Sequence, residues 1–426
     1  MLFTALIVLI FRIGAAIPVP FTNITGSGIV DPTGETFMNY LSMMTGDAFN
    51  YGTIFAMSVT PYINSSIIIQ LLTVAIPALE KLSKEGEEGR KKIATITRYT
   101  TIALALLQST AYFIYLRAKG YVVTDAEGQL FTGFSAVLQG LVVITVLTAG
   151  SAFIMWLGEQ VNDKGIGNGV SIILFAGIVA RMPTLVYMMY AYLMQGGAYF
   201  ALVPIVLILL LAMVAYIVWM DNAERRIPVQ YAKRVVGRKI YGGQNTHIPL
   251  KVNSSGVLPI IFAMSMLQFP ATIVAFIGKS NATKGFAGFI NNFSKGNTWG
   301  YVIVYAVLIV LFTFFYNIVY FDPNDMANNL KKNGGFVPGI RPGQPTADFI
   351  KTSSRRLTWF GSIFLAVLAV FPTVIQIISS YFSKEIGSVN LWFGGTTVLI
   401  LVGVALETVK QLEAQLLMRN YKGFLD

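Results

Sequence analysis

The sequence contains no cysteine and a single histidine, His247, among its 426 residues. Disulfide bonds and thiolate metal sites are therefore excluded, and so is a cluster of histidine ligands. The sequence shows neither a phosphate-binding glycine motif nor a serine nucleophile that could be paired with His247. We therefore expect a protein that is not an enzyme and that holds no metal ion and no other cofactor.

Charged residues are also scarce. Only 12% of the residues are Asp, Glu, Lys or Arg, whereas 55% are hydrophobic. A soluble domain carries roughly twice that charged fraction. Because such a chain cannot cover its apolar surface with polar groups, the composition indicates an integral membrane protein.

Long apolar runs recur along the whole chain, and each is long enough to cross a hydrocarbon core of about 30 Å as a helix. The runs are continuous, whereas membrane strands alternate between apolar and polar residues. We therefore expect an all-α integral membrane protein with ten transmembrane helices. The predicted spans are Leu2–Val19, Thr53–Ile76, Ile93–Leu116, Ser135–Leu157, Val170–Tyr192, Ala201–Met220, Val257–Ile277, Gly300–Tyr320, Leu357–Ile378 and Trp392–Leu406.

The predicted spans contain very few charges. Arg12, Arg98 and Arg181 lie within spans and Glu407 directly follows the last one, whereas no span contains a carboxylate. An ion-coupled transporter is expected to keep carboxylates near the middle of the bilayer. The sequence therefore favours a passive channel, with an ion-coupled small-molecule transporter as the alternative. For Arg12 we expect a mainly structural role, by snorkelling to one face or by pairing with a neighbour.

The basic residues lie mainly on one side of the predicted membrane. Most of the 31 Lys and Arg residues fall in the loops after spans two, four, six and eight and in the C-terminal tail. Because Lys and Arg are enriched in cytoplasmic loops, we expect these loops and both termini to be cytoplasmic. Met1 opens directly into an apolar run without a basic flank. This pattern indicates a retained span rather than a signal peptide, and we expect a short cytoplasmic N-terminal piece to be missing.

Two of the predicted cytoplasmic loops, Asp221–Gly256 and Phe321–Arg356, are unusually long and basic. Loops of this length without a domain of their own are usually functional. One interpretation is a docking surface for a large acidic partner, such as ribosomal RNA or an ATPase. The other is that their charge only fixes the orientation of the chain.

Two further features interrupt the apolar pattern. The outer segment Phe37–Phe49 is too short to span a bilayer and too apolar for a free loop. It is expected to be either a re-entrant piece inside a cavity or a helix lying on the membrane surface. Asn64, Gln70 and Gln108 lie within spans and need polar partners there, which indicates helix–helix contacts or a seam that opens.

Seven stretches of the chain resemble the SecY family, the channel subunits of the bacterial Sec protein translocase. The stretches are long, occur in order and are spread over essentially the whole chain, whereas the outer loops match less closely. They are FRIGAAIPVP from Phe11, PYINSSIIIQLL from Pro61, KEGEEGRKK from Lys84, MWLGEQVNDKGIGNGVSIILFAGIVA from Met155, YAKRVVGRKIYGGQNTHIPLKVN from Tyr231, NNLKKNGGFVPGIRPGQPT from Asn328 and WFGGTTVLILV from Trp392.

The resemblance implies two pseudo-symmetric five-helix halves, related by inversion, around an hourglass pore. The halves would be residues 1–192 and 201–426, with a hinge loop at 193–200. A short plug helix, which Phe37–Phe49 resembles, would close the pore from outside. Carried over residue by residue, the plug would be Asn39, Tyr40, Leu41, Ser42, Met43, Met44, Thr45, Gly46, Asp47 and Ala48. The narrowest point would be a ring of aliphatic side chains, Val59, Ile63, Val170, Leu174, Ile261 and Ile400.

The resemblance also implies an activity and a set of partners. Unfolded polypeptides would pass through the pore, and hydrophobic segments would leave into lipid through a lateral gate. This gate would lie between spans two and three and spans seven and eight, where Asn64 and Gln108 lie. Arg238, Lys239 and Arg341 would contact the motor ATPase SecA or the ribosome. The other expected partners are the small membrane subunits SecE and SecG, preproteins with signal peptides, and the lipid of the plasma membrane.

Overall fold

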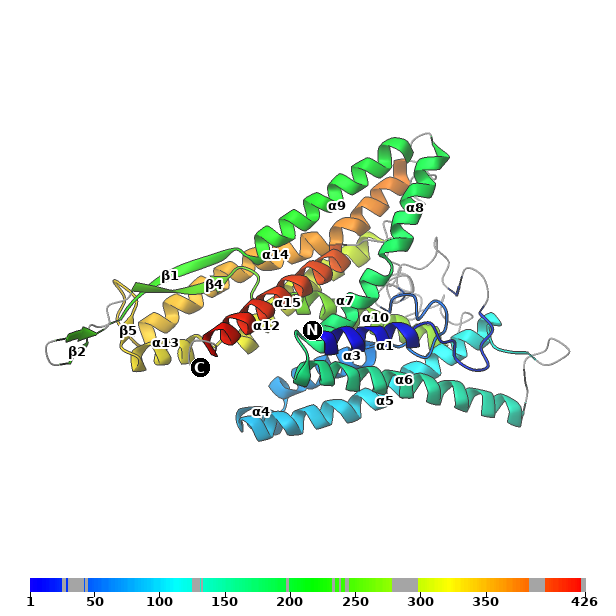
Figure 1. Ribbon diagram of the computed structural model, residues 1–426, viewed down its shortest axis with the longest axis horizontal. Helices are drawn as coiled ribbons and strands as arrows, with labels where there is room; N and C mark the ends of the chain where they lie inside the picture. The colour runs from blue at the N-terminus through cyan, green and yellow to red at the C-terminus, as the bar shows by residue number, and fades with distance from the viewer. Residues whose placement is uncertain are drawn as a thin grey trace.

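The computed structural model describes residues 1–24, 28–29, 42, 45–124, 131, 133–196, 199–231, 234–236, 239–241, 245–277, 298–382 and 395–422. This part of the chain is mostly helical, and each of the ten expected spans coincides with a helix or a pair of helices (Figure 1). The helices are α1 (Leu2–Gly14), α3 (Thr60–Ala75), α4 (Pro77–Lys84), α5 (Glu87–Lys119), α6 (Phe134–Lys164), α7 (Gly169–Ala180), α8 (Met182–Gln195), α9 (Tyr199–Asp221), α10 (Leu258–Ile277), α12 (Trp299–Tyr320), α13 (Pro323–Lys332), α14 (Gln344–Phe382) and α15 (Gly395–Lys422).

Several of these helices qualify as membrane spans by length and apolarity alone. Six described helical segments do so, or seven if the bent pair of α3 and α4 counts as one span. Helix α1 and the Leu258–Leu267 part of α10 are also apolar but shorter. The helical architecture therefore agrees with the apolar runs of the sequence.

The second span is shorter than the sequence predicted. Helix α3 begins at Thr60 rather than Thr53, because residues 53–59 form tight turns in which Ser58 adopts a left-handed φ of 47°. At the other end the chain bends by 106° between α3 and α4. The bend lies at Ile76, which is extended because the next residue is Pro77.

The fifth span is two helices instead of one. Helix α7 ends at Ala180 and α8 begins at Met182, with Arg181 at the junction. Pro183, at the start of α8, has no N–H to continue the hydrogen bonding of α7, which accounts for the break. The break leaves Arg181 between two apolar helices.

The two long loops that were predicted to be cytoplasmic form a small folded extension, although only loops were expected there from the sequence. Strand β1 (Glu224–Tyr231) pairs antiparallel with β4 (Asn245–Lys251), so that Ile227 lies opposite Ile248. Strand β5 (Gly335–Phe336) pairs with β1 as well, giving the sheet order β4–β1–β5. Strands β2 (Arg234–Val236) and β3 (Lys239–Tyr241) form a separate two-stranded sheet.

This extension has its own hydrophobic core. In β1, buried Ile227 and Val229 alternate with exposed neighbours, as expected for a strand with one covered face. Helix α13 and the start of α14 cover that face. The buried core residues are Ile227, Val229, Leu250, Leu330, Val337 and Ile350.

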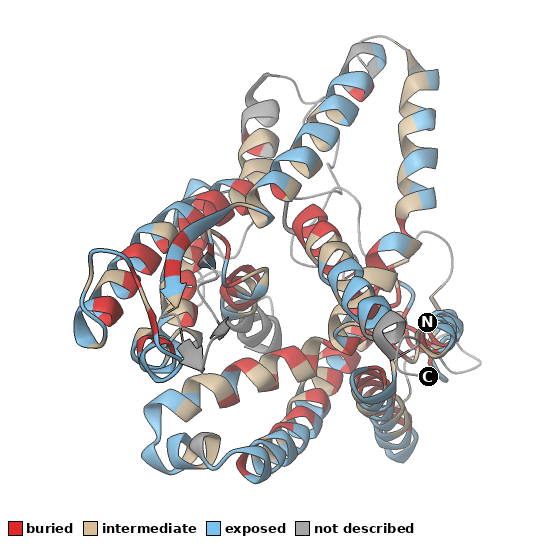
Figure 2. Cartoon of the chain, turned by 60° about the vertical axis from the view of Figure 1, so that its left-hand side comes forward, coloured by how far each residue is buried: buried red, intermediate tan, exposed pale blue. Residues whose placement is uncertain are grey.

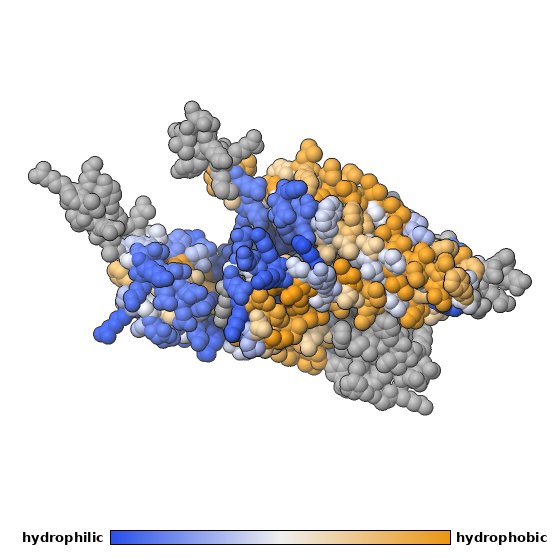
Figure 3. Space-filling model, turned by 90° about the horizontal axis from the view of Figure 1, so that it is seen from below, coloured by the Kyte–Doolittle hydropathy of each residue, from blue (hydrophilic) through white to orange (hydrophobic). Residues whose placement is uncertain are grey.

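The main core is one apolar cluster with members from α1, α3, α6, α7, α9, α10, α12, α14 and α15. The outward faces of the helices are apolar too: Ile208, Ile303 and Leu211 remain 66%, 61% and 59% exposed, and Figure 2 shows exposed residues along these faces. In Figure 3 hydrophobic surface covers much of the molecule, and hydrophilic surface gathers at the end with the strands and α13 and in a second region nearer the centre. An apolar surface of this extent indicates contact with lipid.

Candidate channel site

The six residues assigned to the pore ring lie together in the main apolar cluster. Val59 and Ile63 are one turn apart at the start of α3, and Val170 and Leu174 are one turn apart at the start of α7. Ile261 comes from α10 and Ile400 from α15. All are buried except Val170, which is half-buried and packs against the same cluster.

The start of α7 is fixed against α6 by close backbone contacts. The side chain of Asn162 in α6 accepts a hydrogen bond of 2.8 Å from the Gly169 N–H. A Cβ added to Gly169 would lie 2.0 Å from the carbonyl oxygen of Gly158 in α6, so only glycine fits there. The Asn168 side chain caps α7 by accepting from the Ser171 N–H. These contacts position Val170, the next residue along the helix.

The described part of the plug assignment is buried, apart from Asp47, which is half-buried. Ser42, Thr45 and Ala48 are each about 1% exposed. Residues 45–50 form turns rather than a regular helix. The Tyr112 hydroxyl of α5 donates to the Phe49 carbonyl oxygen, and the two rings lie 4.7 Å apart. The other assigned plug residues lie outside the described residues: Asn39, Tyr40, Leu41, Met43 and Met44.

The turn at Gly46 and Asp47 contacts spans one and five. Both residues have left-handed backbones, with φ of 62° and 70°, which glycine and aspartate tolerate best. A Cβ on Gly46 would lie 3.0 Å from the backbone of Gly177 in α7. Arg12 of α1 donates from Nη1 to the Gly46 carbonyl oxygen at 3.2 Å, and Arg181 Nε lies 2.8 Å from Oδ2 of Asp47.

These contacts extend the sequence prediction. Arg12 does pair with a neighbour, as one of its two expected roles required. No role for Arg181 was predicted from the sequence, although the structure pairs it with Asp47 of the assigned plug. Its partner is distant in the chain, so the only available signal was the rarity of a charge within an apolar run.

The residues assigned to the lateral gate lie on adjacent helices. Asn64 of α3 and Gln108 of α5 are both half-buried, and α10 packs against both of these helices. The Asn64 Oδ1 atom is buried and has no hydrogen-bond partner among the described residues. A buried amide oxygen of this kind is costly in a closed structure.

A direct hydrogen bond also connects span two to span eight. The Tyr316 hydroxyl of α12 donates to Oε1 of Gln70 in α3 at 3.0 Å. Tyr316 is 4% exposed, and its ring lies 5.1 Å from that of Phe262 in α10. The sequence analysis named Gln70 as a polar residue in a span but missed Tyr316, because nothing local distinguishes this tyrosine.

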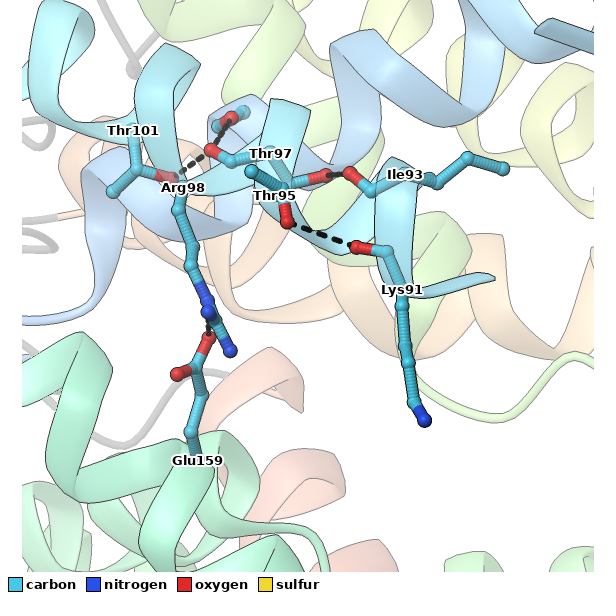
Figure 4. Close-up of polar contacts among 8 residues, drawn as sticks. Lys91, Ile93, Thr95, Thr97, Arg98, Thr101 and Glu159 are labelled. Atoms are coloured by element: carbon cyan, nitrogen blue, oxygen red, sulfur yellow. Dashed lines mark hydrogen bonds and ion pairs between the residues drawn. The ribbon is translucent and has the colours of Figure 1, made fainter. Parts of the chain in front are cut away.

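A polar brace joins α3, α5 and α6. Figure 4 shows Arg98 of α5 pointing to Glu159 of α6, with Nε and Oε1 2.7 Å apart. Ser65 of α3 donates to the Thr97 carbonyl oxygen of α5 at 2.8 Å. Thr97 itself donates to the Ile93 carbonyl one turn earlier (Figure 4). The brace makes these three helices one unit on one side of the assigned gate.

The docking assignment is only partly described. Arg341 is exposed, in the turn between β5 and α14, and its carbonyl oxygen accepts a 2.8 Å hydrogen bond from the Thr346 hydroxyl. Lys239 lies in β3. Arg238 lies outside the described residues. The structure therefore places Arg341 in a turn that this hydrogen bond stabilises, next to the β-sheet extension.

The fold and the site together define a multi-pass membrane protein of the channel type, in which helices from both ends of the chain share one apolar core. The chain belongs to the SecY family, whose model matches residues 53–409. The protein translocase subunit SecY of Streptomyces coelicolor is 43% identical over 440 residues, and that of Mycobacterium tuberculosis is 41% identical over 433 residues. In both cases the alignment covers 100% of this chain and 96% of the relative.

Solved structures have the same fold. A protein conducting channel matches with a TM-score of 0.65 at 18% identity, over 97% of this chain and 91% of that chain. A SecY structure matches equally well, and it concerns a plug domain that stabilises the closed state of the channel and maintains a membrane seal. The channel of a canine ribosome–channel complex matches with a TM-score of 0.59 at 17% identity, over the same shares.

The comparisons confirm two predictions made from the sequence. The seven matching stretches did identify the family. The expected helical membrane fold of a channel with a plug is also that of the solved relatives. The division into halves and the individual site residues stay predictions.

Proposed function

We propose that this chain is the channel subunit of a protein translocase. Unfolded polypeptides cross the membrane through it, and hydrophobic segments leave it sideways into the lipid of the plasma membrane. The observation that carries the proposal is full-length similarity to translocase subunits of the SecY family. The absence of carboxylates from the predicted spans favours this function over an ion-coupled small-molecule transporter, which is expected to carry them at mid-membrane.

The pore ring is proposed to seal the resting channel. Its six side chains are aliphatic and lie in one apolar cluster. A narrow apolar constriction excludes ions because water does not wet it. Flexible aliphatic side chains can still surround a moving polypeptide of any sequence, whereas fixed charges would bind some sequences and repel others.

The plug is proposed to close the pore from the outer side. The buried turn formed by Gly46 and Asp47 lies directly on Gly177 of α7, the helix that also carries Val170 and Leu174 of the ring. The buried positions of Ser42, Thr45 and Ala48 support a closed arrangement.

The lateral gate is proposed to open between two groups of helices. Spans two and three are α3 and α5, which the polar brace joins. Spans seven and eight are α10 and α12. The halves 1–192 and 201–426 would move about the hinge loop 193–200, within which α8 ends at Gln195 and α9 begins at Tyr199.

The energy for transport is proposed to come from partners. The exposed Arg341, together with Arg238 and Lys239, would bind the SecA motor ATPase or the ribosome through acidic groups. SecE and SecG would be the small membrane subunits of the complex, and preproteins with signal peptides its substrates. The basic loops and both termini would face the cytoplasm.

Transport by a reconstituted complex tests this proposal. The chain, with its small membrane subunits and the motor ATPase, is placed in lipid vesicles with ATP and a preprotein. We expect the preprotein to become protected from external protease, and the same preprotein without its signal peptide to stay accessible. Vesicles that move a small solute along an ion gradient, but protect no preprotein, would support the transporter instead.

A further inference from the structure

One ion pair in the interior is not explained by the seal or by the gate. Among the residues that the structure describes, Arg181 is the only buried charged residue, at 8% exposure. Its Nε lies 2.8 Å from Oδ2 of Asp47, whose side chain is 21% exposed. An arginine in an apolar wall is costly unless it is paired, so the pairing with the plug segment needs a reason.

The plug turn is shaped to present the Asp47 carboxylate to Arg181. The Ser42 hydroxyl donates to Oδ1 of Asp47 at 2.9 Å, which leaves Oδ2 for the arginine. The Asp47 N–H donates to the Ser42 carbonyl oxygen at 2.8 Å and closes the turn. The carboxylate is therefore oriented by its own segment before it meets the opposite wall.

Helix α7 carries the receiving surface. Leu174, Gly177 and the C-cap residue Arg181 follow one another at intervals of three and four residues, and therefore lie on one face. Leu174 belongs to the assigned ring, Gly177 touches Gly46, and Arg181 binds Asp47. The seven residues from Leu174 to Arg181 rise about 10 Å along the helix.

Arg12 of α1 holds the same turn from another side, through its hydrogen bond to the Gly46 carbonyl oxygen. The turn is thus held by a backbone contact, a hydrogen bond and an ion pair. Only the ion pair requires two side chains of opposite charge, one of them on the plug.

We propose that the Asp47–Arg181 pair, which we name the plug latch, sets how firmly the plug stays in the resting channel. When the plug leaves, Asp47 moves away with it and its ion pair with the buried Arg181 is broken. The resulting energetic cost opposes spontaneous opening and favours the return of the plug after a polypeptide has passed. The inference rests on the proposed function, since it deepens the role of the plug.

A double-mutant cycle on the full complex tests the plug latch. The variants are Asp47→Asn, Arg181→Gln and the combination of both, and the measurement is the resting ion conductance of the channel complex in planar bilayers. Coupling within close charge pairs starts at about 1.5 kcal/mol, so each single change should raise the open population about tenfold or more. The double variant should leak no more than the leakier single variant, because the same interaction is lost.

Two controls separate misfolding and failure of the proposed function from failure of the latch. Arg117→Gln removes another arginine on the outer side, one that donates to the Phe131 carbonyl oxygen, and it should not leak. Deletion of residues 39–48 should leak at least as much as any latch variant. Each variant should still secrete a preprotein with an intact signal peptide.

The outcomes are distinct. If the channel without residues 39–48 conducts ions at rest but the single variants Asp47→Asn and Arg181→Gln do not, the latch is overturned and the proposed channel function still holds. The latch would also be overturned if the increase in conductance of the double variant equalled the product of the two single increases, because the two residues would then act independently. If the channel without residues 39–48 conducts no ions at rest, the plug assignment is wrong, and so is the latch.

Discussion

The hydrogen bond between Tyr316 and Gln70 makes a quantitative prediction about the lateral gate. It joins α12 to α3, so it is present only when spans two and eight are together. Tyr316→Phe removes the hydroxyl and keeps the ring against Phe262. We therefore expect the variant to weaken the closed gate without disturbing the apolar packing of α10 and α12.

The magnitude follows from what such bonds contribute within membranes. Hydrogen bonds between membrane helices average about 0.6 kcal/mol and reach about 1.7 kcal/mol. The closed-to-open equilibrium should therefore shift about threefold, and at most about twentyfold, towards the open gate. A shift of this size is too small to abolish transport but large enough to alter a graded assay.

The assay is the lateral insertion of test segments of graded hydrophobicity, each fused into a secreted reporter. Tyr316→Phe should lower the hydrophobicity at which half of the segments enter the membrane. Tyr305→Phe is the matched control. The contact of its hydroxyl with the Met264 sulfur, at 3.8 Å, joins span eight to span seven, so this contact does not cross the gate. A threshold unchanged in Tyr316→Phe, or moved equally by both variants, would refute the role of this bond.

Three further variants test other parts of the account. Arg341→Glu should cripple secretion while the complex still assembles and folds, because it reverses the charge of an exposed docking residue; normal secretion would count against docking there. Ile261→Asn should make the resting pore leak ions by wetting the ring, and a tight pore in bilayer recordings would remove that assignment. Gly169→Ala should lower the melting temperature in detergent, since its Cβ would meet the Gly158 carbonyl at 2.0 Å and overpacking costs about 1–3 kcal/mol. Gly158→Ala should be tolerated, because a Cβ added there would lie 3.5 Å from its nearest neighbour, a side-chain carbon of Val170. Equal melting temperatures of the two variants would contradict this packing.

The sequence predicted the helices well because long apolar runs are a local property. The sequence predicted the ends and breaks of the helices less well, because these depend on turns and on contacts with distant residues as well as on local apolarity. Residues 53–59 are apolar enough to extend span two, yet the left-handed Ser58 shows that they form turns. Pro183 was a readable signal for the break in span five, but the run around it is so apolar that it was taken as one helix.

The β-sheet extension was missed for a different reason. Its strand β1 does show alternation, with Ile227 and Val229 facing its core. The basic residues just before these positions, Arg225 and Arg226, were interpreted as topogenic charge or as part of a docking surface, which hid the pattern. The strand becomes stable only through pairing with β4 and β5 and through packing against α13, contacts that sequence reasoning could not supply.

The pairings between distant segments could not be predicted at all. Gln70 and Tyr316 are 246 residues apart in the chain, and the sequence gives no reason to choose one tyrosine over another. The same holds for Arg181 and Asp47. The ring assignment, in contrast, came from family resemblance, and its six members do lie in one cluster.

The central claim is that a polypeptide in transit passes through the apolar ring. Because the chain has no cysteine, a single introduced thiol reports on one position only. Leu174→Cys and Ile261→Cys should form disulfides with a cysteine in a stalled, half-translocated polypeptide. Ile303→Cys and Leu211→Cys, on outward faces that are 61% and 59% exposed, should not. Equal crosslinking from the outward positions, or none from the ring positions, would contradict the account.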